Sequence, residues 1–177
     1  MAIDKIISAS ITDGTIATAD IADGAVTSVK TTGVGGVNTP AFEAKLSSSQ
    51  AIANQTYVKV QFSDEVFDSD GTYDNSTNYR FTPGVVGKYY MFAQVCLDDL
   101  NDGSFFDIYL KKNGSNYRAV SRLYSGHTNK QSSILVYIEN VTSTSDYYEI
   151  DVYQNTGVSR NLRTDIGSYF GAYKIIE

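Results

Sequence analysis

KVQFSDEVFDSDGTYDNSTNYRFTPGVVGKYYMFAQV occupies residues 59–95 of the 177-residue chain. In order along this stretch come a short strand-like segment that ends at Phe62, a Tyr73-Asp74 loop, the tripeptide Phe81-Thr82-Pro83, and Gly87 two residues before Tyr89. A long apolar segment follows. Short apolar runs bounded by turn-forming residues are typical of antiparallel β-strands.

The same pattern continues on both sides of this stretch. Alternate residues are apolar in four segments, which is the period of a strand: Val58, Val60 and Phe62; Phe106, Ile108 and Leu110; Ile134, Val136 and Ile138; and Tyr148, Ile150 and Val152. Clusters such as LNDG, KKNGSN and QNTG separate these segments. No segment carries a helical stripe, so residues 42–177 are expected to form one all-β domain of eight to ten antiparallel strands, a sandwich or jelly roll.

The order of these elements resembles the globular head domain of the complement and tumour-necrosis-factor-like superfamily. The matching residues are Phe62, Tyr73, Asp74, Phe81, Thr82, Pro83, Gly87 and Tyr89, followed by LKKNG at 110–114 and SYFGAYKI at 168–175. The Gly-Asp pair that usually precedes the penultimate strand is replaced here by TSTSDYYEI, and no collagen-like stalk is present. The resemblance implies a ten-strand jelly roll that forms a trimer with aromatic side chains along its threefold axis.

The N-terminal segment carries a ten-residue repeat, in which ITDGTIATAD at 11–20 aligns with IADGAVTSVK at 21–30. Its large apolar residues recur every five positions, which fits neither a helix nor a straight strand. We expect the Asp-Gly pairs Asp13-Gly14 and Asp23-Gly24 to form the turns between them. The apolar residues are Ile6, Ile11, Ile16, Ile21 and Val26.

One ribbon with so few apolar residues cannot bury them alone. We therefore expect residues 1–36 to form an intertwined trimeric stem whose core is these five residues, with residues 37–41 as a hinge. The alternative is a flexible linker, which a Gly/Thr/Ala-rich composition also allows.

A thin repeat stem before such a head resembles the short appendage proteins of tailed bacteriophages. The leading hypothesis is a non-enzymatic homotrimeric virion protein, a short tail fibre, head fibre or capsid decoration, whose stem attaches to capsid or tail proteins and whose head is exposed for host-surface or glycan binding. The alternatives are a secreted lectin-like or cytokine-like trimeric ligand and, less favoured, a glycan hydrolase, which requires two facing carboxylates.

Net charge and composition exclude several other classes. The net charge of −6 argues against a nucleic-acid partner, because such proteins present a basic surface. The single cysteine, Cys96, cannot close an internal disulfide, and the single histidine cannot build a histidine-based zinc site. No 18-residue apolar segment occurs, and Asp4 and Lys5 interrupt the position of a signal peptide. We therefore expect a virion protein made in the host cytoplasm, without membrane insertion or a required cofactor.

Residues 110–130 form a basic segment that contains no acidic residue. Cations interleaved with aromatic rings suit an anionic polysaccharide, although the simpler explanation is a polar strand face that pairs with the acidic segment of a neighbouring subunit or virion protein. The candidate surface-binding residues are Lys111, Lys112, Tyr117, Arg118, Arg122, Tyr124, His127 and Lys130.

Residues 63–75 hold five acidic residues and no basic one. Asp68 and Asp70 are candidate calcium ligands because they are oxygen donors in a turn-forming segment, but their spacing is not that of an EF-hand. The simpler interpretation is a solvated turn capped by aspartate side chains.

Overall fold

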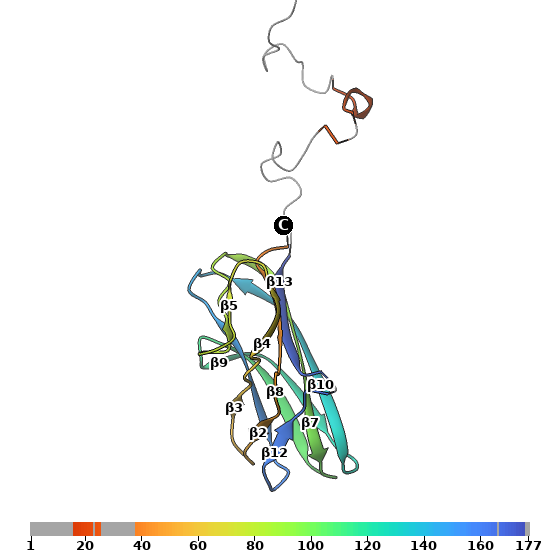
Figure 1. Ribbon diagram of the computed structural model, residues 1–177, viewed down its shortest axis with the longest axis vertical. Helices are drawn as coiled ribbons and strands as arrows, with labels where there is room; N and C mark the ends of the chain where they lie inside the picture. The colour runs from red at the N-terminus through yellow and green to blue at the C-terminus, as the bar shows by residue number, and fades with distance from the viewer. Residues whose placement is uncertain (1–15, 23, 26–37, 166, 176–177) are drawn as a thin grey trace, which may run out of the picture. The chain divides into compact units, whose positions relative to one another are not determined.

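The computed structural model describes residues 16–22, 24–25, 38–165 and 167–175. The chain divides into two units, Met1–Gly36 and Val37–Glu177, and each is described by itself. We call the second unit the head. Figure 1 follows the chain through it.

The N-terminal unit has one short helical turn in its described part, the 3-10 helix η2 (Thr18–Asp20). The Asp20 carboxylate accepts a hydrogen bond from the Ala17 N–H at 2.9 Å, which caps this turn. A second turn is closed by the Ala25 N–H and the Ala22 carbonyl at 2.9 Å, and Gly24 within it has a φ of 76°, which suits glycine. Ile16 and Ile21 are 53% and 43% exposed in the single chain. The other predicted stem residues, Ile6, Ile11, Asp13, Gly14, Asp23 and Val26, lie outside the described residues.

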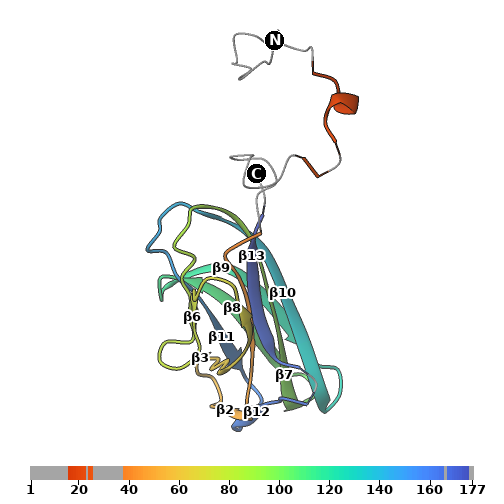
Figure 2. The same ribbon diagram turned by 45° about the horizontal axis from the view of Figure 1, so that its top comes forward.

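The head is a sandwich of two antiparallel sheets, which face each other in Figure 2. The seven-stranded sheet has the order β2-β12-β7-β13-β1-β4, and β10 pairs with the other edge of β7. Its strands are β1 (Ala41–Lys45), β2 (Gln50–Ile52), β4 (Asp64–Asp68), β7 (Gly87–Leu100), β10 (Asn129–Val141), β12 (Arg160–Leu162) and β13 (Tyr169–Lys174).

The six-stranded sheet has the order β5-β6-β11-β8-β9, and β3 also pairs with β11. Its strands are β3 (Val58–Lys59), β5 (Tyr73–Asp74), β6 (Arg80–Phe81), β8 (Phe105–Lys112), β9 (Asn116–Tyr124) and β11 (Tyr148–Gln154). The turn between β8 and β9 contains Asn113 and Gly114, both with positive φ, as an Asn-Gly hairpin turn requires.

The recognisable motif of residues 59–95 builds the core between the sheets. Phe62, Phe81 and Tyr89 are fully buried, and Tyr73 is buried as well. Phe42 stacks on Tyr73 and on Phe81, each with ring centroids 4.6 Å apart, and meets Phe170 edge-on at 5.0 Å. Aromatic packing of this kind contributes beyond the area that it buries. The aromatic residues of the motif therefore form part of the core of the head.

Three of the four alternating segments have the side-chain phase that the sequence predicts. Phe106, Ile108, Leu110, Tyr148, Ile150 and Val152 are buried, and so are Val60 and Phe62. The fourth differs: Ile134, Val136 and Ile138 of β10 are 59%, 54% and 57% exposed, while Leu135, Glu139 and Val141 point into the sandwich. The apolar alternation of β10 thus marks the outer face of its sheet.

Two boundaries also differ from the sequence prediction. The acidic segment 63–75 is not only a loop, because Asp64–Asp68 forms the edge strand β4, paired with β1. β1 begins at Ala41, the last residue assigned to the hinge. The described residues form thirteen strands rather than eight to ten, because several edge segments are only two or three residues long.

Candidate interaction surfaces

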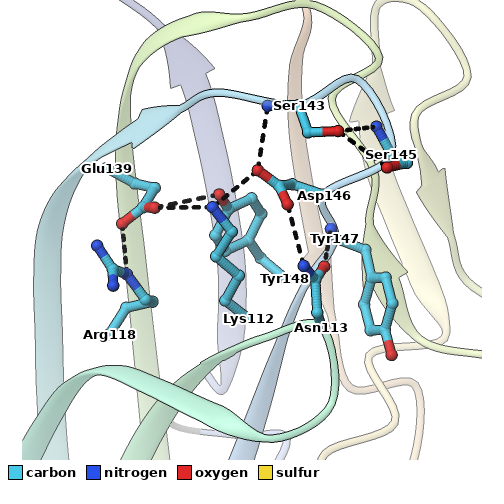
Figure 3. Close-up of polar contacts among 9 residues, drawn as sticks. All are labelled: Lys112, Asn113, Arg118, Glu139, Ser143, Ser145, Asp146, Tyr147 and Tyr148. Atoms are coloured by element: carbon cyan, nitrogen blue, oxygen red, sulfur yellow. Dashed lines mark hydrogen bonds and ion pairs between the residues drawn. The ribbon is translucent and has the colours of Figure 1, made fainter.

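The predicted basic segment is neutralised by acidic side chains from elsewhere in the head. Figure 3 shows its end nearest the β8–β9 turn, where Glu139 of β10 lies between Lys112 of β8 and Arg118 of β9. The Glu139 carboxylate accepts a hydrogen bond from Arg118 Nε at 2.8 Å and lies 3.4 Å from Lys112 Nζ. Tyr148 of β11 donates its hydroxyl to the same carboxylate at 3.3 Å. Glu139 is 1% exposed, so these contacts replace its hydration.

Asp146 completes this cluster. Its carboxylate lies 2.7 Å from Lys112 Nζ and accepts hydrogen bonds from Asn113 Nδ2 at 3.0 Å and from the Ser143 N–H at 3.3 Å (Figure 3). Burial by itself would raise the pKa of Asp146, but the hydrogen bond and charge of Lys112, together with Asn113, outweigh it and lower that pKa. Both cations of this end are therefore already paired.

Two further cations of the segment, Arg122 and Lys111, are paired on the outer face of the six-stranded sheet. Arg122 binds the fully buried carboxylate of Asp107 through two hydrogen bonds of 2.7 Å, and this pairing raises the pKa of Arg122. Lys111 Nζ lies 2.9 Å from Asp151 and 3.8 Å from Glu149. Bidentate and charge-assisted pairs of this kind are strong and directional.

The structure therefore brings Lys111, Lys112, Arg118 and Arg122 onto neighbouring strands, but as halves of ion pairs. The acidic partners are Asp107, Glu139, Asp146, Glu149 and Asp151, which the sequence prediction missed. For Glu139 the sequence does hold an indication, because this residue occupies an inward position of its strand, between the buried Leu135 and Val141. These pairs all lie within one chain, so pairing of the segment with a neighbouring subunit or virion protein stays a prediction.

The other predicted binding residues lie apart from these pairs or belong to a different cluster. His127 is exposed in the connection between β9 and β10, and Lys130 is exposed at the start of β10. The His127 carbonyl accepts a hydrogen bond from the Ser125 hydroxyl. Tyr117 lies on β9, and its side chain is outside the described part of the structure. Tyr124 is 65% exposed and lies beside Phe105.

The predicted calcium ligands organise a turn. Both oxygens of Asp68 accept hydrogen bonds, from Thr72 Oγ1 at 3.1 Å and from the Tyr73 N–H at 2.7 Å. Asp70 accepts a hydrogen bond from the neighbouring Ser69 hydroxyl. In the next turn the Thr77 N–H and the Asn78 side chain bind the Asp74 carboxylate and lower its pKa. Among the described residues, no three His, Cys, Asp or Glu side chains converge as a metal cluster. Calcium binding stays a prediction.

A second surface is the outer face of the seven-stranded sheet. Ile134, Val136 and Ile138 of β10 lie directly opposite Gln94, Phe92 and Tyr90 of β7. Because directly paired residues share one face of a sheet, these side chains form a continuous outer surface. The surface continues onto β13, whose Tyr169, Gly171 and Tyr173 pair with the same three β7 residues. We call it the apolar face, and it comprises Ile134, Val136, Ile138, Tyr90, Phe92, Tyr169 and Tyr173.

The centre of the apolar face is closely packed. Tyr90 lies 5.4 Å from Tyr173 and 6.0 Å from Phe92 between ring centroids, and Phe92 lies 6.1 Å from Tyr169. The Phe92 ring covers Gly171, where an added Cβ would meet Phe92 Cε2 and the Phe42 carbonyl oxygen, both at 2.9 Å. A contiguous exposed patch of this kind on a head of this size is typical of an interaction surface.

None of the helical segments in the described part of the chain has the length and apolarity needed to cross a membrane. No family model matches the sequence, and no curated protein matches it.

Solved structures do match the head. The globular domain of the zebrafish complement 1qA protein superposes with a TM-score of 0.59 at 16% identity, over 77% of this chain and 98% of that one. Murine APRIL gives a TM-score of 0.58 at 11% identity, over 76% and 98% of the two chains. Eiger TNF from S. frugiperda gives 0.55 at 13% identity, over 76% and 91%. The predicted complement and tumour-necrosis-factor-like jelly-roll fold is confirmed for the head. At this level of identity, the matches establish the fold alone.

Proposed function

We propose that the chain is a non-enzymatic binding protein that works as a homotrimer, assembled through the apolar face of the head. The exposed β10 residues Ile134, Val136 and Ile138 carry this proposal, because they are β-branched, contiguous and more than half exposed in the single chain. Covering them with the rings of a second copy would bury apolar area on both partners. Trimer formation is also what the resemblance to the complement and tumour-necrosis-factor-like head implies.

The repeat supports the same assembly. Ile16 and Ile21 are exposed in the single chain, and three copies wound together would bury them against one another. The stem of residues 1–36 would then share its trimeric state with the head.

The finer proposal is a virion appendage, a short tail fibre, head fibre or capsid decoration, whose stem attaches to other virion proteins. The decapeptide repeat that precedes the head supports it. The three solved structures named above are complement and tumour-necrosis-factor-type proteins, and their likeness to the head is equally consistent with the alternative, a secreted lectin-like or cytokine-like ligand.

Light scattering on the full chain tests the assembly. We expect three times the 19.4 kDa chain mass for the native protein. Val136→Asp places a carboxylate at the centre of the apolar face and is expected to reduce the mass or force dissociation on dilution, because a buried unpaired charge is costly. The matched control is Val158→Asp, which changes a valine that is similarly exposed (53%) outside the apolar face. A monomeric native protein, or equal behaviour of the two variants, would contradict assembly through this face.

Particle composition tests the virion role. Antibodies against the head are expected to label purified particles, and a chain that lacks residues 1–36 is expected to be absent from them. Native chains found only as free trimers would favour the secreted ligand instead.

A further inference from the structure

The outer face of the six-stranded sheet carries a row of aromatic rings that no part of the proposed assembly uses. Tyr124 of β9 lies 5.7 Å from Phe105 of β8 between ring centroids, and Phe105 stacks on Tyr153 of β11 at 5.8 Å. Tyr57, just before β3, lies 5.0 Å from Tyr153 and 5.2 Å from Tyr109. We call these five residues the aromatic row.

Two members of the aromatic row are open to solvent. Tyr57 is 51% exposed and Tyr124 is 65% exposed, whereas Tyr109 beneath Tyr57 is only 6% exposed. The buried ring is fixed in place, because the Tyr109 hydroxyl donates a hydrogen bond to Asp107 at 2.6 Å, and Tyr57 packs edge-on against this ring. Burial and this hydrogen bond raise the pKa of Tyr109, so its phenol stays protonated. Four of the five rings are thus held on strands, and Tyr57 lies in the loop just before β3.

One charged side chain, Arg122, lies over the row at its Tyr124 end. The Arg122 guanidinium lies 4.0 Å above the Phe105 ring centroid and donates two hydrogen bonds to Asp107. It also approaches the Tyr124 hydroxyl, with Nη1 at 3.4 Å. Arg122 has a side-chain exposure of 44%, so its outer edge still faces solvent while its charge is balanced.

The ion-paired charges beside the aromatic row balance one another. Three cations, Lys59, Lys111 and Arg122, are matched by three acids, Asp107, Glu149 and Asp151, each within an ion pair. An anionic ligand gains little here, because binding it would require opening a pair. The same balance disfavours single-stranded nucleic acid, which needs basic groups for its phosphates in addition to ring stacking.

We propose that the aromatic row binds a neutral carbohydrate. A sugar ring has an apolar C–H face and a rim of hydroxyl groups, which match an exposed ring face bordered by tyrosine hydroxyls and a charge-balanced arginine. The site differs from the anionic polysaccharide site that the basic segment suggested. It rests on the proposed binding role of the head, and it does not require trimer assembly.

The test is an array of neutral oligosaccharides, built from hexoses and N-acetylhexosamines, beside sulfated and uronic-acid polysaccharides. The full-length chain is applied at about 50 mM and about 500 mM salt, a range over which exposed charges become screened. We expect binding to at least one neutral sugar with the same affinity at both salt concentrations. Tyr57→Ser and Tyr124→Ser are each expected to weaken it by about tenfold, as the loss of one ring contact implies.

These two tyrosines are chosen because their exposure leaves the core intact when they are changed. Tyr147→Ser is the matched control, since Tyr147 lies under Arg80, 4.3 Å from its guanidinium, and outside the aromatic row. Unchanged melting temperatures of the Tyr57 and Tyr124 variants verify that they fold.

Three results would overturn the inference. The first is that no neutral sugar binds. The second is that only anionic sugars bind and that their binding disappears at high salt. The third is a lower molar mass of the Tyr57 and Tyr124 variants, which would make the row a contact between copies. Sugar silence with an intact trimer refutes this inference alone, whereas sugar binding by a monomer refutes the proposed assembly alone.

Discussion

Gly171 shows how one residue links the core to the apolar face. It lies on β13 between Phe92 of β7, whose ring covers it, and the backbone of Phe42 on the neighbouring strand β1. The position has no room for a side chain because the sheet is covered at this point by an aromatic ring. The position of the Phe92 ring on the apolar face therefore depends on the absence of a Cβ at residue 171.

Gly171→Ala is expected to lower the free energy of unfolding by about 1–3 kcal/mol, the usual range for overpacking. The added methyl must push the Phe92 ring outward and strain the backbone at Phe42. Urea unfolding measures the change. Gly126→Ala is the control, because a Cβ there meets no atom within 4 Å. Equal stability of the two variants would contradict the packing described.

Asp146 gives the head a defined response to acid. Its folded pKa is lowered, so its contribution to stability is fully present above the ordinary aspartate pKa of about 4 and is lost as the pH falls toward the folded value. The native chain is therefore expected to lose more thermal stability between pH 7 and pH 3 than Asp146→Asn does.

Melting temperatures over this pH range measure the effect. Asp165→Asn is the control, since Asp165 forms an exposed pair with Arg163, and such pairs contribute little. A gap between the native chain and Asp146→Asn that stays the same at pH 3 and pH 7 would exclude the ion pair with Lys112 as its cause.

At the scale of elements, Glu139 joins the two sheets. It belongs to β10 of the seven-stranded sheet, and its partners Lys112, Arg118 and Tyr148 belong to three strands of the other sheet (Figure 3). Hydrophobic contacts between sheets tolerate sliding, whereas a carboxylate with three defined partners does not. This cluster fixes the register of one sheet on the other.

Glu139→Gln is expected to destabilise the head by about 2–4 kcal/mol, because it leaves two cations beside a neutral group, partly offset by their access to water. Thermal unfolding measures the loss, and Glu65→Gln on the exposed edge strand β4 serves as the control. If Glu139→Gln proved as stable as the control, the cluster would not hold the sheets together.

The sequence alone predicts the strands and their class, and it predicts the contents of the core for three of four alternating segments. It fails on β10, because Leu135 and Val141 alternate with Ile134 and Val136, and an apolar residue on each face leaves the phase undetermined. The sequence indicates the basic segment but not its acidic partners, because Asp107 and Glu149 come close to Arg122 and Lys111 only through strand pairing. The aromatic row was missed for the same reason: its rings come from three strands and a loop.

At the scale of the whole molecule, stem and head are expected to be separate cooperative units in a common trimer. Ile16→Asp with Ile21→Asp would place six carboxylates near one axis of the stem, which is strongly unfavourable. We expect this double variant to lose the stem's transition in a circular-dichroism melt while the transition of the head persists.

Ala17→Asp with Ala19→Asp is the control for charge, since it adds the same number of carboxylates outside the five-residue spacing. An unchanged melt of the Ile16 and Ile21 variant would indicate that residues 1–36 are a linker rather than a stem.

The place where the chain enters the head has a mechanical consequence. β1 starts at Ala41, directly opposite Tyr173 near the end of β13, and it is hydrogen-bonded on its other edge to β4. If residue 40 is pulled while the opposite end of the head is held, the force runs along β1. It then acts on the hydrogen bonds of β1 to β13 and to β4 at the same time. A pull between residues 40 and 175 would instead peel β1 from β13 one hydrogen bond at a time. The head should thus resist tension between a tether at its N-terminus and a captured surface far better than tension between its own two ends.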